Sequence, residues 1–290
     1  MTASKPSAAL APIPRITIET AVALALAEDL GLAGDITTNA TIPATAEAQA
    51  DFVVREAGVI SGLNVARATF AAVDPDVTFA ADVADGARVE PGDRIASVGG
   101  PARAVLTGER VALNFMGRMS GIASLTAEYA GAIAGTRARI IDTRKTTPGL
   151  RAFEKYAVRC GGGTNHRVGL FDAVLIKDNH IAVAGGIGPA VLAARAHAGH
   201  MVKIEVEVDT LAQLRDALAH NIDAVLLDNM PPDTLRESVR LIDGRCLAEA
   251  SGGVTLETVR AIAEAGVDLI SVGALTHSAS VLDIGLDITI

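Results

Sequence analysis

The stretch KIEVEVDTLAQLRDALAHNIDAVLLDN, residues 203–229, contains two short apolar runs on either side of a helix-like segment. Six such runs follow Gly135, and the later ones recur roughly every twenty residues. Apolar runs that alternate with helices predict consecutive right-handed βα units around a parallel sheet, and therefore an α/β fold. The six runs are ARIIDT (138–143), AVLIKD (173–178), KIEVEV (203–208), AVLLDN (224–229), CLAEAS (246–251) and LISVGA (269–274).

Nearly every run ends in polar residues or glycine. In a parallel barrel these ends converge on one face, which is where barrel active sites lie. A doubly wound sheet would use only the loops beside its switch point. The pattern therefore favours a barrel. The residues at the ends are Arg144 and Lys145, Lys177, Glu205 and Glu207, Asp228, Glu249 and Ser251, and Gly273.

The first part of the chain has a different pattern. Between about residue 48 and residue 105, short β-type runs are separated by Gly, Asp and Pro, which predicts a small sheet in an α+β domain. A helical segment, GERVALNFMGRMSGIASLTAEYAGAIAG, follows it. We expect a disordered tail over residues 1–14, an N-terminal domain over 15–117 and a barrel domain over 118–275, with 276–290 as a segment that could pack with the N-terminal domain.

Composition argues against several classes of function. A net charge of −9, a pI near 5.2 and only 3% aromatic residues are unlike a nucleic-acid-binding protein. No run approaches the roughly 18 apolar residues of a membrane span, which argues against a membrane protein. Cys160 and Cys246 lie far apart and match no metal-ligand spacing. We therefore expect both to be reduced, in a cytoplasmic protein.

Residues 139–180 form a basic segment in an otherwise acidic chain, with eight Lys and Arg against four Asp and Glu. Such a segment suits a compact, multiply charged anion. Arginine holds a carboxylate or phosphate by two hydrogen bonds and lysine adds a compact charge. A histidine taken alone is more often structural, but the position of His166 between Asn165 and Arg167, after three glycines, makes a structural role and a binding role equally well supported. Arg151, Lys155 and Arg159 recur at helical spacing and fit a partly solvated helix face better. The candidates for the anion site are Arg144, Lys145, His166, Arg167 and Lys177.

Two further groups of strand-end residues are acidic or glycine-rich. Glu205 and Glu207 share one face of their strand, so with Asp228 they could ligate Mg²⁺ or hold ribose hydroxyls. An internal salt bridge from these carboxylates to Lys145 or Lys177 is the structural alternative. The segments 251–253 and 272–274 place backbone N–H groups and helix starts together, as in the phosphate site of late barrel loops. Together the three groups indicate a phosphoribosyl donor and an anionic acceptor.

Several long motifs resemble those of the quinolinate phosphoribosyltransferase family, also called nicotinate-nucleotide pyrophosphorylase (carboxylating). They cover nearly the whole chain and include EDLGLAGDITT (28–38), GERVALNFMGRMSGIA (108–123), DTRKTTPGLRAFEKYAVRCGGGTNHRVGL (142–170), LIKDNH (175–180), EVEVD, LLDN, EASGG and SVGALTHS. The resemblance implies an N-terminal open α/β sandwich and an incomplete barrel of about seven strands. It also implies transfer of phosphoribose from phosphoribosyl pyrophosphate to the quinolinate ring nitrogen with release of CO₂, which gives nicotinate mononucleotide for NAD synthesis.

The resemblance further implies residue roles. Thr143 joins the substrate-binding set, and Lys145, Glu207 and Asp228 would be catalytic. Glu207 and Asp228 would also hold Mg²⁺, directly or through other groups. Arg110 would reach the active site of the neighbouring subunit, which makes a homodimer, or a hexamer of dimers, the expected assembly. The quinolinate carboxylates would be bound by Arg144, His166, Arg167 and Lys177, the pyrophosphate side by Lys145, and the 5′-phosphate by Ser251, Gly252, Gly253, Val272, Gly273 and Ala274.

Three alternatives remain open at the level of sequence. One is an enzyme of the same fold that acts on another pyridine or anionic base, such as nicotinate. Another is a Schiff-base barrel lyase that uses Lys177, because class I aldolases also place a lysine at a strand end. The third is a phosphate-metabolite binding protein without activity. Clustered cations and paired glycine loops favour the phosphoribosyltransferase over the lyase.

Overall fold

The computed structural model describes residues 10–289 and divides into two compact units. Unit 1 contains the described residues up to Ser124, together with Pro148–Gly161 and the C-terminal segment from Ala279. Unit 2 contains Leu125–Thr147 and Gly162–Ser278. The long helix α4 (Ala102–Ala132) runs without a break through residue 118, where the barrel domain was expected to begin. The domain boundaries drawn from the sequence stay predictions.

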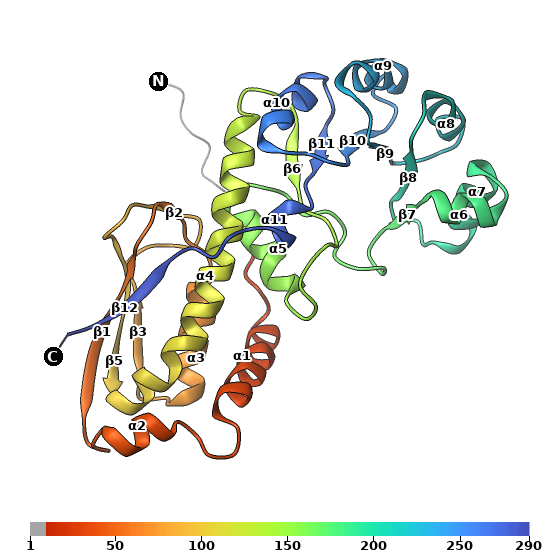
Figure 1. Ribbon diagram of the computed structural model, residues 1–290. Helices are drawn as coiled ribbons and strands as arrows, with labels where there is room; N and C mark the ends of the chain where they lie inside the picture. Colours follow the sequence, from red (N-terminus) through yellow and green to blue (C-terminus); the bar gives the residue numbers. More distant parts are fainter. Residues whose placement is uncertain (1–9, 290) are drawn as a thin grey trace. The chain divides into compact units, whose positions relative to one another are not determined.

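Unit 1 is built on a four-stranded antiparallel sheet in the order β12-β1-β5-β3. The strands are β1 (Glu47–Val54), β3 (Thr78–Ala81), β5 (Arg94–Pro101) and β12 (Ile284–Thr289), beside a small pair formed by β2 (Gly58–Val59) and β4 (Arg88–Val89). Its helices are α1 (Arg15–Leu30), α2 (Ile36–Thr41), α3 (Leu63–Val73), α5 (Arg151–Cys160) and the first part of α4. Since β12 pairs with β1 from Gln49 and Thr289 to Val54 and Ile284, the C-terminal segment forms an edge of the N-terminal sheet (Figure 1).

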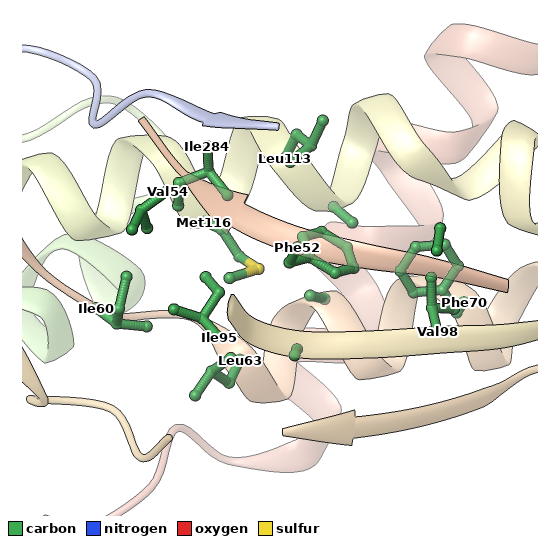
Figure 2. Close-up of a cluster of buried hydrophobic side chains, with 14 of the residues drawn as sticks. Phe52, Val54, Ile60, Leu63, Phe70, Ile95, Val98, Leu113, Met116 and Ile284 are labelled. Carbon is green, nitrogen blue, oxygen red and sulfur yellow. The ribbon is translucent and has the colours of Figure 1, made fainter. Parts of the chain in front are cut away.

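The interior of unit 1 is apolar. Alternate residues of β1, namely Ala50, Phe52 and Val54, are fully buried, as the two-residue period of a strand requires when one face is covered. The ring of Phe52 lies 6.0 Å from that of Phe70 in an edge-on arrangement, which is a favourable geometry for aromatic pairs. Met116 and Leu113 of α4 complete this core (Figure 2). Burial of aliphatic and aromatic side chains therefore stabilises unit 1.

Unit 2 contains a parallel sheet of six strands in the order β6-β11-β10-β9-β8-β7. All six apolar runs predicted as strands form it. The strands are β6 (Arg139–Ile141), β7 (Val174–Ile176), β8 (Ile204–Val208), β9 (Ala224–Asp228), β10 (Leu247–Ser251) and β11 (Leu269–Ser271). From β7 to β11 each strand lies beside the next one in sequence, and β6 then follows β11. The order never reverses, so this is the arrangement of an incomplete barrel and not of a doubly wound sheet.

Helices follow the strands of unit 2. They are α6 (Asp178–Ala184), α7 (Ile187–His197), α8 (Leu211–Ala217), α9 (Pro232–Ile242), α10 (Leu256–Glu264) and α11 (Ala274–His277), and α7 to α10 line the outer side of the sheet (Figure 1). Local signals fix their starts. The hydroxyl of Thr210 accepts a hydrogen bond from the backbone of Gln213, and Pro232 occupies the first turn of α9, where its missing N–H costs nothing.

The sheet is open between β6 and β7, and the expected seventh strand is reduced to a single bridge. Thr164 pairs with Ile141 in parallel, and its N–H donates to the carbonyl of Ile140 at 2.8 Å. This bridge adds one residue to the free edge of β6. Within residues 10–289, the sheet of unit 2 therefore has six strands and one isolated bridge, one strand fewer than the expected seven.

Two expectations about packing need correction or restriction. The predicted tail lies partly outside the described residues, but within residues 10–14 Ile13 is buried and the carbonyl of Ala11 accepts a hydrogen bond from Arg159 at 2.9 Å. That part of the chain is packed, not disordered. Lys155 was expected on a partly solvated helix face, yet it is only 3% exposed. Within residues 10–289 no helix combines the length and apolar character needed to cross a bilayer.

Candidate active site

One face of the parallel sheet carries the polar residues that the sequence singled out. Glu207 of β8 pairs with Leu226 of β9, and Leu226 pairs with Glu249 of β10. Because paired residues of parallel strands project from the same side, these three side chains share one face, and Asp228 and Ser251 follow on it two residues later. The opposite face carries buried apolar residues such as Val206 and Leu227. The alternation of β8, β9 and β10 thus directs the acidic residues inward.

A cavity of about 750 Å³ lies at the carboxyl ends of these strands. Its size is typical of a small-molecule site. It is lined by residues from all six strand ends and from the loop after Gly162. The lining includes the following predicted residues: Thr143, Arg144, Lys145, His166, Arg167, Lys177, Glu207, Asp228, Ser251, Gly252, Gly253, Gly273 and Ala274.

Two predicted residues do not line the cavity. Val272 is 1% exposed, and its N–H donates to the carbonyl of Ile141 at 3.0 Å within the sheet. Neither its side chain nor its N–H is therefore available to a phosphate. Arg110 is an exposed residue of α4 in unit 1. Its role from a neighbouring subunit stays a prediction.

The cationic residues of the cavity are close enough to repel one another. Burial lowers the pKa of Arg167, and the neighbouring charge of Arg144 lowers it further. One terminal nitrogen of Arg167 donates to the carbonyl of Ala173 at 3.1 Å, while its Nε is buried without a partner. A buried donor without an acceptor is costly. An anion bound in the cavity would relieve the repulsion between Arg144 and Arg167.

Lys177 and Glu207 form an ion pair across β7 and β8. Lys177 Nζ donates to Glu207 Oε2, and the side chain of Glu207 is 14% exposed against 45% for Lys177. The structural alternative considered for the acidic group is therefore partly realised. Because the lysine side chain remains nearly half exposed to the cavity, the pair leaves it accessible to a ligand.

The turn formed by Asp228 and Asn229 packs so closely against Gly252 that no side chain fits at that position. Asn229 has φ 52°, in the left-handed region that asparagine tolerates better than most residues. Its side-chain amide donates to Asp228 at 2.6 Å, and its N–H donates to the carbonyl of Ser251 at 2.9 Å. Gly252 has φ 92°, and a Cβ there would lie 2.1 Å from Asn229 Oδ1. Any side chain at Gly252 would therefore displace the residue that orients Asp228.

Lys145 is placed by contacts with its own turn and with the last strand loop. Its N–H donates to the hydroxyl of Thr143 at 3.0 Å, and its carbonyl accepts from the hydroxyl of Thr276 at 2.7 Å. Gly273 lies against it, since a Cβ at Gly273 would be 3.0 Å from Lys145 Cδ and 3.2 Å from His277 Nε2. Absence of a side chain at Gly273 thus permits the approach of both.

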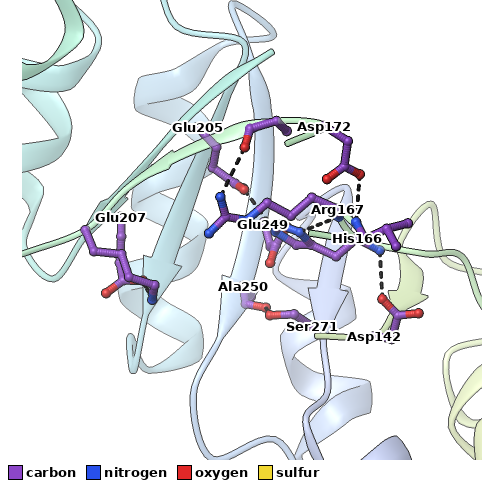
Figure 3. Close-up of polar contacts among 12 residues, drawn as sticks. Asp142, His166, Arg167, Asp172, Glu205, Glu207, Glu249, Ala250 and Ser271 are labelled. Carbon is purple, nitrogen blue, oxygen red and sulfur yellow. Dashed lines mark hydrogen bonds and ion pairs between the residues drawn. The ribbon is translucent and has the colours of Figure 1, made fainter. Parts of the chain in front are cut away.

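Buried carboxyl groups lie beneath the cationic residues. Glu205 and Glu249 are 8% and 1% exposed, and His166 Nε2 lies 3.0 Å from Glu205 and 3.7 Å from Glu249. Burial, followed by the charge of Glu205, raises the pKa of Glu249 well above its usual range. Figure 3 shows His166 and Arg167 between Asp142 on one side and the two glutamates on the other. The ligand atoms of His166, Glu205 and Glu249 lie within 4.8 Å of one another, so this cluster could also hold a metal ion.

Comparison with known proteins connects this geometry to a family. The model of the quinolinate phosphoribosyl transferase N-terminal domain matches residues 35–120, and that of the C-terminal domain matches residues 122–287. The chain belongs to the quinolinate phosphoribosyl transferase family. Since both domain models match in order and together span most of the sequence, membership extends to both units.

Individual relatives of the quinolinate phosphoribosyl transferase family agree. The chain is 46% identical over 263 residues to a probable nicotinate-nucleotide pyrophosphorylase [carboxylating] from Bacillus subtilis, covering 91% of this chain and 90% of that protein. It is 47% identical over 274 residues to the nicotinate-nucleotide pyrophosphorylase [carboxylating] from Mycobacterium leprae, covering 91% and 94%. The crystal structure of NadC from Streptococcus pyogenes superposes with a TM-score of 0.92 at 41% identity, covering 97% of this chain and 100% of that one.

Sequence reasoning missed several residues of this quinolinate phosphoribosyl transferase site. Asn229 and His277 line the cavity but were not selected, and Glu249 was noted only as a strand end. The signal for Asn229 was its place directly after a strand that ends in aspartate, where a left-handed residue often follows. For Glu249 the signal was the two-residue period, which places it on the same face as Ser251. The role of Asp142 depends on a contact with the loop at His166, which no local pattern shows.

Proposed function

We propose that this protein transfers phosphoribose from phosphoribosyl pyrophosphate to the ring nitrogen of quinolinate, with loss of CO₂, to give nicotinate mononucleotide and pyrophosphate. One observation carries the proposal: a single cavity is lined by a group of cationic side chains, by two inward carboxylates and by a glycine-rich rim. A dicarboxylate acceptor and a phosphorylated sugar require these three chemistries together. The relatives with this family's sequence are named for the same reaction.

The cationic side of the cavity receives the two carboxylates of quinolinate. Arg167, Arg144 and Lys177 line this side and supply the positive charge. Hydrogen bonds to charged groups contribute about 1.5–3 kcal/mol each, so a few of them offset the desolvation of a small dianion. A monocarboxylate such as nicotinate would leave part of this charge unpaired.

The opposite rim receives the 5′-phosphate of the donor. Gly252 and Gly253 precede α10, and Gly273 precedes α11. Backbone N–H groups at such turns and the positive end of the α10 dipole favour a phosphate. Ser251 adds a hydroxyl at the end of β10. The phosphate and the pyridine dicarboxylate are thereby held at opposite sides of one cavity.

Between these ends, Glu207 and Asp228 face the anomeric carbon of the donor. Displacement there develops positive charge on the ribose ring, which the carboxylates stabilise, while Lys145 stabilises the negative charge of the departing pyrophosphate. Holding both substrates in one site supplies much of the remaining rate by orientation. After transfer, the ring nitrogen is cationic, and its charge stabilises the electron pair that stays on the adjacent ring carbon when the carboxylate departs as CO₂. That carbon then takes up a proton from solvent, so the step needs a proton donor and no base.

Mg²⁺ is the cofactor we propose for this site. Glu207 and Asp228 are inward carboxylates on adjacent strands, and Mg²⁺ is commonly held by one or two carboxylates together with waters and substrate phosphates. The ion would neutralise pyrophosphate charge as that group leaves. Because Lys177 already pairs with one oxygen of Glu207, Asp228 is the better placed of the two to contact the ion.

We also propose that the active assembly is a homodimer in the cytoplasm, in which Arg110 of each subunit enters the site of the other. Complementation tests the dimer. Arg110→Ala and Lys177→Ala each remove activity, but heterodimers of the two have one intact site. Mixing after reversible dissociation should restore about a quarter of the parental activity if subunits pair at random. Inactivity of the mixture, with mixed dimers present by mass spectrometry, would rule out a shared site.

The central experiment compares two acceptors. Purified protein with Mg²⁺ and phosphoribosyl pyrophosphate should release pyrophosphate and CO₂ from quinolinate, and at least about a hundredfold less pyrophosphate from nicotinate, because a monocarboxylate leaves part of the clustered positive charge in the cavity without a partner. Equal turnover of both would favour the same fold acting on a different base. Retained binding of the donor without any turnover would favour a binding protein. Borohydride trapping at Lys177 would favour the lyase.

A further inference from the structure

Both ring nitrogens of His166 are engaged inside the protein. The backbone N–H of Arg167 donates to His166 Nδ1 at 2.6 Å, so Nδ1 acts as an acceptor and carries no proton. The ring proton then lies on Nε2, which donates to Glu205 Oε2 at 3.0 Å. A neutral imidazole in this tautomer has no second N–H to offer to an anion.

The loop that carries His166 is fixed at its backbone as well. Asp142, which is fully buried at the end of β6, accepts from the N–H of His166 at 2.9 Å and from the side-chain amide of Asn165 at 2.5 Å. Asp142 thus holds the residues before Arg167, and the His166 ring holds the N–H of Arg167 itself. The position of the Arg167 backbone depends on both.

The buried residues Glu205 and Glu249 contact the ring of His166. Two neighbouring carboxyl groups at this depth cannot both be charged without a large penalty, and Glu249 is the more buried. The groups that face it are Glu205, Asp142, Ser271 and His166, of which the first two are acidic and favour its neutral form. Glu205 is the nearer of the two to the ring, since its Oε2 lies 3.0 Å from His166 Nε2 and that of Glu249 lies 3.7 Å away.

We propose that His166 is a positioning residue that orients Arg167 toward the pyridine dicarboxylate and does not itself bind the anion, with Glu205 and Glu249 lying against its ring. The inference rests on the proposed function for the identity of the anion. It assigns recognition of the carboxylates to arginine and lysine, and it makes the buried carboxyl groups part of the substrate site without any contact to the substrate.

The tautomer of His166 tests the proposal directly. Nitrogen-15 NMR of the ring nitrogens, assigned by comparison with His166→Asn among the six histidines of the chain, should show a protonated Nε2 and an unprotonated Nδ1. The same state should persist when quinolinate is added. A doubly protonated ring, or protonation of Nδ1 on addition of quinolinate, would overturn the proposal. The free protein suffices for the first measurement, so a failure of the proposed function would show separately, as absent turnover.

Two substitutions of Glu249 test whether this residue helps to hold His166 and Arg167 in position. Glu249→Gln keeps a neutral group with a hydrogen-bond donor and should leave the KM for quinolinate within about twofold of the parent. Glu249→Leu removes the donor at similar volume and should raise that KM about tenfold, with little change in the KM for phosphoribosyl pyrophosphate, because only Arg167 is displaced.

If both substitutions raise the KM for quinolinate equally, Glu249 is not neutral in the parent protein. Such a result would mean that a carboxylate is needed, as in a metal site. Equal harmlessness would overturn its supporting role. Metal analysis of the parent protein after dialysis should find no ion bound in proportion to the chain. A stoichiometric ion that is lost in Glu249→Gln would overturn the proposal independently of activity.

Discussion

The sheets of the two units use their inward faces in opposite ways. In unit 1 the inward residues of β1 are Ala50, Phe52 and Val54, all fully buried and apolar. In unit 2 the inward face of β8 and β10 carries Glu205, Glu207 and Glu249. A buried carboxyl group lowers the free energy of unfolding, whereas a buried aliphatic side chain raises it. The inward face of unit 1 therefore stabilises the fold, whereas the inward face of unit 2 carries acidic side chains that lower stability and form the candidate active site.

Unit 2 can do so because the other face of its sheet is apolar. Ile204, Val206, Val225 and Leu227 are all fully buried on that side. Since successive residues of a strand point to opposite faces, one strand supplies both the core and the site. Substitutions at neighbouring positions of one strand should therefore differ strongly in their effects on stability and on activity.

The largest effect is expected in the core of unit 1. Phe52→Ala should lower the free energy of unfolding by about 3–5 kcal/mol, because it removes a fully buried ring and leaves a cavity. Chemical denaturation measures it. The matched control is Phe171→Ala, at a phenylalanine that is 82% exposed, which should change stability by less than about 0.5 kcal/mol. Similar losses in both variants would contradict the assignment of the core.

Removal of a charge from the cavity should lower activity strongly and change stability little, in contrast to the core substitution. Lys177→Ala should lower kcat/KM for quinolinate by about 10²–10³-fold, since a group that binds an anion is lost, while stability changes by no more than about 1 kcal/mol for a partly exposed ion pair. Steady-state kinetics and denaturation measure the two quantities. Lys203→Ala is the control, because Lys203 precedes β8 at the opposite end of the strands and is 77% exposed. Loss of activity in the control would mean that charge in general, not position, matters.

A substitution at the rim should impair donor binding. Gly252→Ala should raise the KM for phosphoribosyl pyrophosphate by about tenfold or more, because the new Cβ would collide with Asn229 and move Asp228. Gly253→Ala is the matched control. Gly253 also has a positive φ, but nothing lies within 4 Å of its Cβ position. If both variants behave alike, backbone strain and not the Asn229 contact governs the loop.

The smallest effect concerns the pH dependence of stability. The pKa of Glu249 is raised in the folded state, so its favourable contribution is complete below the unfolded value of about 4.3 and is lost as the pH rises toward the folded value. Glutamine does not titrate. The stability of Glu249→Gln relative to the parent should therefore increase from pH 5 to pH 8 in urea unfolding. Glu237→Gln, at a half-exposed side chain, serves as the control and should show a weaker trend. A difference independent of pH would contradict a buried neutral Glu249.

The sequence was sufficient for features that depend on local alternation. All six strands of unit 2 and most strand-end residues of the cavity follow from runs of apolar residues and what ends them. It was insufficient where a contact joins distant segments. The bridge from Thr164 to Ile141, the burial of Lys155 and the bonds from Asp142 to the His166 loop depend on packing that has no local signature. Val272, predicted for the phosphate site, lies between the lining residues Ser271 and Gly273 but is itself buried.

The gap between β6 and β7 also has a consequence for the order of folding. From β7 to β11 each strand pairs with the next along the chain, so this part of the sheet can grow by successive local closures. β6 instead pairs Arg139 with Leu269, about 130 positions later in the sequence. Contacts of such separation are slow to form because a long loop must close first. Arg144 and Lys145 follow β6 in sequence, so we expect the binding cavity to be completed only when this long-range pairing forms.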